Sequence, residues 1–183
     1  GSNNTAIGVQ ALYANTTGTR NIAIGKDAYD NADTEDDNLA IGYAALGGAI
    51  DGGEYNVAIG NYSLDANTSG DFNTAVGYDG LSANTTGQGN TATGYQALYA
   101  NTTGVSNTAS GRQALYANTT GDFNSAFGTY ALANNTEGGY NTASGQQSLY
   151  VNTTGNYNSA FGLSALGANT TGGSNTATGV YSL

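Results

Sequence analysis

Apolar and polar positions recur every 17 residues along almost the whole chain. The stretch from Asn90 to Gly104 reads NTATGYQALYANTTG, and the pattern restarts at Asn107 as NTASGRQALYANTTG. A short period of this kind is typical of a solenoid, in which each repeat is one coil stacked on the next. The Asn that opens each unit lies at Asn4, Asn21, Asn38, Asn56, Asn73, Asn90, Asn107, Asn124, Asn141, Asn158 and Asn175, with one 18-residue unit after Asn38. We therefore expect residues 1–183 to form a single repeat domain of eleven 17-residue coils, a fragment of a longer fibre.

The first segment of each unit, Asn-Thr-Ala-x-Gly, has the pattern of a short strand. Its Ala occurs in every unit, from Ala6 to Ala177, while the residues on either side of it vary. Because side chains alternate between the two faces of a strand, we expect Ala to point inward with Asn and Gly. The two neighbours of Ala then point to the opposite face.

The second segment, x-x-Ala-Leu-x-Ala, is also expected to be extended, with its Leu pointing inward. That Leu is replaced only once, by Tyr29, and the residue after it varies as an outward position does. Asn-Thr-Thr-Gly then makes the return turn. A helix is locally compatible with QALYAN, but the Gly, Asn and Thr content disfavours it, and helical repeats usually need 33 residues or more. The pattern predicts an all-β parallel β-roll, roughly 50 Å long at about 4.8 Å per coil.

Composition agrees with a thin, repetitive core. Leu, Ile, Val and Phe together make up about 15% of the chain, which is below the level of an ordinary globular domain. There is no Pro to interrupt a ladder and no Cys to form a disulfide. No apolar run approaches the ~18 residues of a membrane helix, so we expect no membrane insertion by this segment.

The net charge of −10 argues against nucleic-acid binding, because phosphate contacts depend on Lys and Arg. Eleven of the 13 acidic residues lie between Asp27 and Asp79. The acidic turn Asp30–Asp37 and the insertion Gly47–Gly53 should lie side by side on the outer rim, with solvated charges. Calcium is the alternative for this turn, but the Gly and distal Glu of an EF-hand loop are absent. A solvated acidic face is favoured, and we expect no metal and no cofactor.

Catalytic residue types are scarce. The chain has no His and no Cys, and its only basic side chains are Lys26, Arg20 and Arg112. Its many hydroxyl groups therefore have no base to activate them. A carboxylate pair within Asp30–Asp37 is the remaining possibility for acid–base chemistry. We expect the protein not to be an enzyme.

Tyrosine is the residue type best suited to binding. Tyr13, Tyr99, Tyr116 and Tyr150 follow the Leu on the outward register, and Tyr99 and Tyr116 belong to adjacent coils. Amphipathic rings on a rigid scaffold suit contacts to glycans or proteins. The alternative interpretation is that these rings only shield a thin roll from water.

Three early units carry a more specific pattern. Asn56–Gly60 reads NVAIG, Asn21–Gly25 reads NIAIG and Asn38–Gly42 reads NLAIG. This motif resembles that of trimeric autotransporter adhesin heads, and the later NTAxGxxALxxNTTG units resemble repeats of phage tail fibres. The resemblance implies a left-handed parallel β-roll, three chains per fibre, an extracellular location, and a cell-surface protein or glycan as ligand. It covers essentially the whole chain.

A homotrimer would bury the row that follows the strand Ala. The isolated roll is poor in large apolar side chains, so the aliphatic and aromatic members of this row need a second surface to cover them. The expected trimer-interface residues are Ile7, Ile24, Ile41, Ile59, Val76, Phe127 and Phe161.

The rival function is ice binding, because Thr91-Ala92-Thr93 and Thr176-Ala177-Thr178 imitate threonine ladders. An ice-binding face should be flat and uniform, whereas this row changes size from Ser to Phe. Packing around a threefold axis tolerates such variation, because the residues of one coil contact only the same residues of the two other chains.

Overall fold

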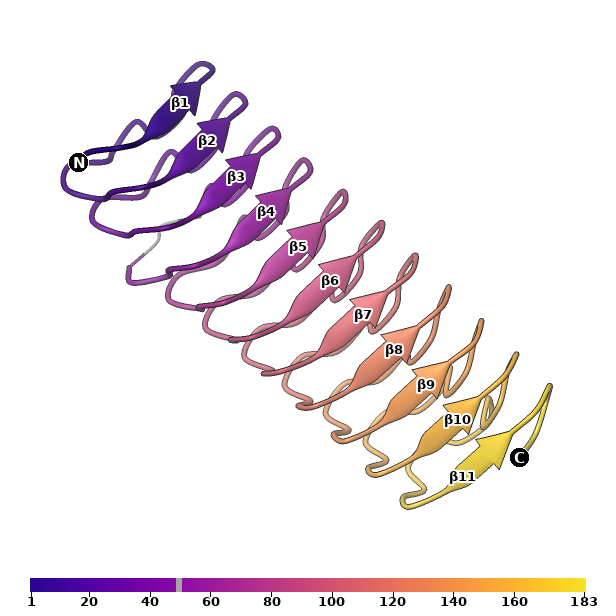
Figure 1. The fold of residues 1–183 in the computed structure, drawn as a ribbon. Helices are drawn as coiled ribbons and strands as arrows, with labels where there is room; N and C mark the ends of the chain where they lie inside the picture. Colours follow the sequence, from indigo (N-terminus) through magenta and orange to yellow (C-terminus); the bar gives the residue numbers. More distant parts are fainter. Residues whose placement is uncertain (49–50) are drawn as a thin grey trace.

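The computed structural model describes residues 1–48 and 51–183 and shows a parallel β-solenoid of about ten turns (Figure 1). Each coil contributes one three-residue strand, and the eleven strands form one sheet in chain order. The strands are β1 (Thr5–Ile7), β2 (Ile22–Ile24), β3 (Leu39–Ile41), β4 (Val57–Ile59), β5 (Thr74–Val76), β6 (Thr91–Thr93), β7 (Thr108–Ser110), β8 (Ser125–Phe127), β9 (Thr142–Ser144), β10 (Ser159–Phe161) and β11 (Thr176–Thr178). No helix occurs among the described residues. The insertion Gly47–Gly53 falls partly outside them, at residues 49–50.

The strands pair in parallel and in register, so equivalent positions of successive coils form continuous rows. Ala92 of β6 lies opposite Ala109 of β7, for example, and Thr91 opposite Thr108. The strand Ala is fully buried in every coil from β2 to β10, while the residues on either side of it are partly or fully exposed. The prediction that Ala points inward and its neighbours outward is confirmed.

The prediction of a second strand is wrong, because the return half of each coil is a chain of turns. Ala97 and Leu98 are both fully buried, whereas successive residues of a strand would face opposite sides. Gln96 and Leu98 have φ angles of 53° and 52°, in the left-handed region that few non-glycine residues adopt. This curl directs two consecutive side chains into the core.

Two ladders of buried Asn accompany the Ala and Leu of the core. In the strand ladder, the backbone N–H of Asn107 donates to Asn90 Oδ1 (2.9 Å), and Asn107 Nδ2 donates to the Gly121 carbonyl (2.8 Å). In the turn ladder, Asn118 Nδ2 donates to Asn101 Oδ1 (2.8 Å) and to the same Gly121 carbonyl (2.9 Å). The two ladders thereby satisfy polar groups that would be costly to bury unpaired.

Glycine is required at the turn because neighbouring atoms lie too close to leave space for a side chain. A Cβ at Gly121 would lie 2.5 Å from Asn118 Oδ1 and 2.4 Å from the Gly138 carbonyl oxygen of the next coil. A side chain at this position is therefore incompatible with a ladder Asn three residues before it.

The second coil replaces three core residues together. Tyr29 stands in place of Leu, Ala32 in place of the turn-ladder Asn, and Glu35 in place of the turn Gly. Tyr29 is fully buried, and its hydroxyl accepts a hydrogen bond from Asn38 Nδ2 (2.6 Å). Because Ala32 has no amide, Asn15 Oδ1 of the first coil is buried without a hydrogen-bond partner among the described residues.

Glu35 corrects the prediction that the acidic turn is solvated. Its side chain is only 3% exposed and accepts hydrogen bonds from the backbone N–H groups of Asp33 (3.0 Å), Thr34 (3.1 Å) and Gly52 (3.2 Å). The bond to Gly52 does place the acidic turn beside the insertion, as expected. Burial of this carboxylate is explained by the donors that replace water around it.

Candidate functional site: two exposed surfaces of the solenoid

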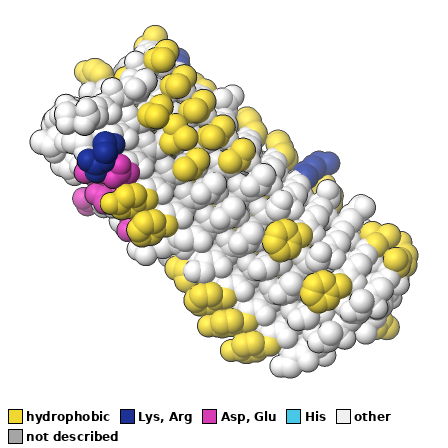
Figure 2. All heavy atoms as spheres, viewed as in Figure 1, with side chains coloured by type: hydrophobic (Ala, Val, Ile, Leu, Met, Phe, Trp, Pro, Cys, Tyr) yellow, Lys and Arg dark blue, Asp and Glu magenta, His cyan; other side chains and the backbone are white. Residues whose placement is uncertain are grey.

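The outer face of the sheet carries the expected interface residues. Ile7, Ile24, Ile41, Ile59, Val76, Phe127 and Phe161 are each the last residue of a strand, so in-register pairing places them in one row. Large members of the row are open to solvent in the single chain: Ile7 is 59%, Phe127 46% and Phe161 42% exposed. Figure 2 shows apolar side chains gathered over the N-terminal strands and further apolar groups along the rod.

A second apolar row, which sequence reasoning missed, runs along the turns that lead into the strands. The residue before the strand Asn is aromatic in five coils and has a left-handed backbone (φ 57° at both Tyr55 and Phe72), so it belongs to the turn that leads into the strand. Neighbouring rings of this row stack, with centroids 5.1 Å apart for Tyr55–Phe72, 5.0 Å for Phe123–Tyr140 and 5.0 Å for Tyr140–Tyr157. Recurrence of Tyr or Phe just before Asn was the sequence signal that could have revealed it.

Between the two aromatic groups the face is small and polar. β6 presents Thr91 and Thr93, both exposed, and the preceding row holds Gly89 and Ser106 at this level. The sheet face is therefore most apolar over β1 to β5 and hydroxyl-rich at β6 and β7. It carries Phe127 and Phe161 in β8 and β10 and ends on the exposed Thr176 and Thr178 of β11.

The return half of the coils carries the expected tyrosines. The rings of Tyr99 and Tyr116 stack, with centroids 5.2 Å apart and planes inclined by 7°. Tyr150 instead packs edge-to-face on Tyr130, at 6.3 Å and 84°. Tyr13, which is 76% exposed, lies far away on the first coil. The structure thus brings together three of the four predicted tyrosines.

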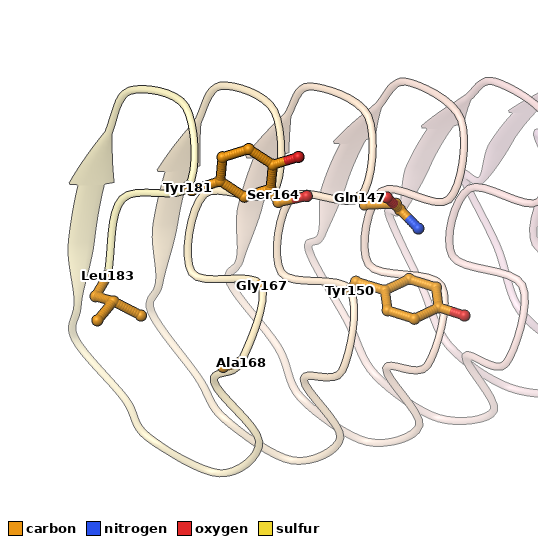
Figure 3. A pocket seen from close by; sticks show the side chains of 7 residues that line it. All are labelled: Gln147, Tyr150, Ser164, Gly167, Ala168, Tyr181 and Leu183. Carbon is orange, nitrogen blue, oxygen red and sulfur yellow. The ribbon is translucent and has the colours of Figure 1, made fainter.

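Two hollows lie beside these rings and share Tyr150. The smaller, of about 170 Å³, is lined by Gln113, Tyr116, Tyr130, Ala133, Asn134 and Tyr150. The larger, of about 400 Å³, is lined by residues of the last coils, among them Gln147, Ser164 and Tyr181 (Figure 3). All of these side chains come from the return half of the coil and none from the strands.

A third aromatic row, also unforeseen, runs along the corner where the strand turns into the return half. Tyr43, Tyr62, Tyr78 and Tyr95 contact one another in succession, with centroids 5.2, 5.9 and 5.7 Å apart. Cations lie at its ends, because Lys26 is 5.2 Å from the Tyr43 ring and Arg112 is 6.0 Å from the Tyr95 ring. Such contacts add modest stabilisation at exposed sites.

The charged side chains of the first coils pair with one another. Arg20 Nε lies 2.6 Å from Asp37 Oδ1, and Arg20 Nη2 lies 3.2 Å from Asp36 Oδ2. The hydrogen bond from Arg20 lowers the pKa of Asp37, and bonds from Thr19 lower the pKa of Asp36. Farther along, burial raises the pKa of Asp65 to about 6, with a further contribution from the charge of Asp79.

Neither a metal cluster nor a membrane-spanning helix is found in the described part of the chain. Residues 1–48 and 51–183 bring no three acidic side chains together as metal ligands. The same residues contain no apolar helix of sufficient length to cross a bilayer. The acidic residues of the second coil instead bond to backbone N–H groups and to Arg20.

Comparison with known proteins returned no match among protein-family models, curated proteins or solved structures. Function is therefore inferred from the exposed surfaces of the solenoid and from the repeat motifs.

Proposed function

We propose that three copies of this chain pack around a threefold axis with their sheet faces inward, forming an extracellular adhesive fibre that attaches to a cell-surface protein or glycan. The module presents a surface and carries out no turnover. The left-handed coil and trimeric arrangement follow the resemblance of the NVAIG-type units to trimeric autotransporter heads; tail fibres offer the same architecture.

The exposed apolar sheet face is the observation that carries this proposal. On the sheet face Ile22 is 39%, Phe127 46% and Phe161 42% exposed, and Phe72 (60%) and Phe123 (47%) are exposed on the turns before the strands, in a chain that is otherwise rich in Asn, Thr and Gly. Contiguous apolar patches on soluble proteins mark interaction surfaces. In a trimer, the outward residues of each coil would be covered by the same residues of the two other chains. Each coil can therefore carry side chains of a different size.

Attachment is tested by screening the intact assembly against immobilised glycans and cell surfaces. Saturable binding by the assembled protein, lost when assembly is disrupted, is the expected result. Equal attachment by an assembly-deficient variant would show that the trimer is dispensable for adhesion.

The ice-binding alternative is favoured by the exposed Thr176 and Thr178 of β11 and by the hydroxyl-rich middle of the sheet, where Thr91 and Thr93 are exposed. The aromatic rows on either side of this short stretch would hold a flat ice plane away from it. Thermal hysteresis that disappeared in a Thr91/Thr108/Thr142 variant would establish this function instead of the fibre.

A further inference from the structure

We propose that the hollow over Ala133 binds one neutral pyranose ring, which stacks on the open face of Tyr116. This inference rests on the proposed adhesive function and names the ligand class of that surface. The hollow encloses about 170 Å³, below the ~300 Å³ at which pockets for drug-sized ligands begin, so it suits a single ring.

The hollow arises from one missing side chain in a row of tyrosines. The position after the core Leu holds Tyr99, Tyr116, Ala133 and Tyr150 in four successive coils. Tyr116 and Tyr150 are therefore two coils apart, about 10 Å along the solenoid. Ala133, only 5% exposed, forms the floor between them.

Three tyrosine rings surround the hollow: Tyr116 offers one ring face for stacking, and Tyr150 and Tyr130 form two of its sides. Tyr116 is nearly parallel to Tyr99 (7°), which covers one of its faces, so the opposite face is directed along the solenoid towards the Ala133 level. Tyr150 bounds the far side, and Tyr130, packed edge-to-face against it, bounds a third. The electron-rich face of an aromatic ring attracts the polarised C–H groups on the apolar side of a sugar.

Amide groups at the rim can recognise sugar hydroxyls. Gln113 Nε2 donates to Gln96 Oε1 (2.9 Å), and Asn134 Nδ2 donates to the Tyr150 carbonyl (2.9 Å). These bonds hold the two amides in place, and each amide has a second N–H and a carbonyl oxygen for further bonds. The lining includes no charged side chain, which favours a neutral ligand.

The test is ligand-observed NMR on the assembled protein, with methyl β-galactopyranoside and methyl β-glucopyranoside as probes. Saturation transfer to at least one probe, with millimolar affinity, is expected for a single ring. Ala133→Tyr places in the hollow the side chain that the neighbouring coils carry at this position. It should preserve the melting temperature and weaken binding at least about tenfold.

Ser82→Tyr is the matched control. Ser82 occupies the same position one coil before Tyr99, so this change extends the ring stack at its other end and leaves the hollow untouched. The Ser82→Tyr variant should bind the methyl pyranosides with the same affinity as the wild type. Tyr116→Leu, which removes the stacking face while keeping apolar volume, should weaken binding as Ala133→Tyr does.

Two outcomes would overturn the inference: no saturation transfer to either probe in the wild type, or undiminished affinity in both Ala133→Tyr and Tyr116→Leu. A trimer without sugar binding would refute this site alone. Sugar binding by a monomer would support this site and refute the proposed assembly.

Discussion

At the scale of single residues, the buried asparagines link each coil to the next. Asn118 illustrates this: it donates to Asn101 Oδ1 and to the Gly121 carbonyl, and its own Oδ1 accepts from Asn135 Nδ2 (2.9 Å). An amide side chain is needed here because it both donates and accepts along the ladder axis. No apolar residue can replace it without leaving its neighbours unpaired.

Asn118→Ala should therefore destabilise the fold by about 2–4 kcal/mol, since it leaves buried partners on two adjacent coils unsatisfied. Urea unfolding of the variant and the wild type measures the difference. The exposed turn residue Thr120 supplies the control, because Thr120→Ala should change stability by less than ~0.5 kcal/mol. Equal effects of the two changes would contradict the role assigned to the ladder.

The second coil shows that the core positions are coupled. Tyr29, Ala32 and Glu35 fit one another, because a ladder Asn at position 32 would meet the Cβ of Glu35, as the geometry at Gly121 shows. In this coil the Tyr29 hydroxyl accepts a hydrogen bond from Asn38 Nδ2, and the Glu35 carboxylate accepts one from the backbone N–H of Asp33.

We accordingly expect Ala32→Asn alone to cost about 2 kcal/mol or more through overpacking. The triple change Tyr29→Leu, Ala32→Asn and Glu35→Gly restores the regular coil and gives Asn15 Oδ1 its missing donor. This variant should be at least as stable as the wild type in thermal unfolding. If the triple variant were as unstable as the single one, the three positions would not be coupled as described.

At the scale of elements, sequence reasoning predicted the strand half of each coil and failed on the return half. Alternation around the Ala was sufficient to place β1 to β11, because a strand has only two faces. The turns depend on left-handed backbone at Gln96 and Leu98, and neither Gln nor Leu favours that conformation. Stacking on neighbouring coils imposes it, and such contacts between coils are not visible in one repeat.

The candidate site was predicted to a similar extent. The outward position of Tyr99 and Tyr116 follows from the repeat alone. The hollow over Ala133 does not, because it depends on which ring faces its neighbours cover. The aromatic row before the strand Asn was not predicted, because its residues lie in the turn before the strand and outside the two positions that flank Ala.

Asp65, between the fourth and fifth strand levels, should make stability depend on pH. In the folded protein the Asp65 carboxyl group keeps its proton up to about pH 6, whereas an unperturbed Asp loses its proton near pH 3.8. The native state therefore binds more protons between these values, and stability should fall as pH rises across this window. Asp65→Asn should make stability less dependent on pH in this window and raise the free energy of unfolding by about 1 kcal/mol at pH 7. This gain is smaller than the pKa shift of Asp65 alone implies, because the side chain is partly exposed. An unchanged slope would contradict the assignment.

At the scale of the whole molecule, we propose that the sheet face governs assembly. Ile24 and Ile41 are adjacent in its N-terminal apolar part and are paired in register. Ile24→Asp with Ile41→Asp would place charges in the proposed interface, and both side chains reach solvent in the single chain, so the coil itself should survive. Sedimentation velocity should show dissociation, while circular dichroism remains unchanged. The control Thr129→Asp, which lies on the turn after β8 and outside the sheet face, should leave the assembly intact.

The mass of the wild-type protein in solution tests the central claim most directly. One chain has a mass of 18.3 kDa. Light scattering on a size-exclusion column should give three times this value if the exposed apolar face packs around a threefold axis. A monodisperse peak at the mass of a single chain, stable across micromolar concentrations, would contradict the account.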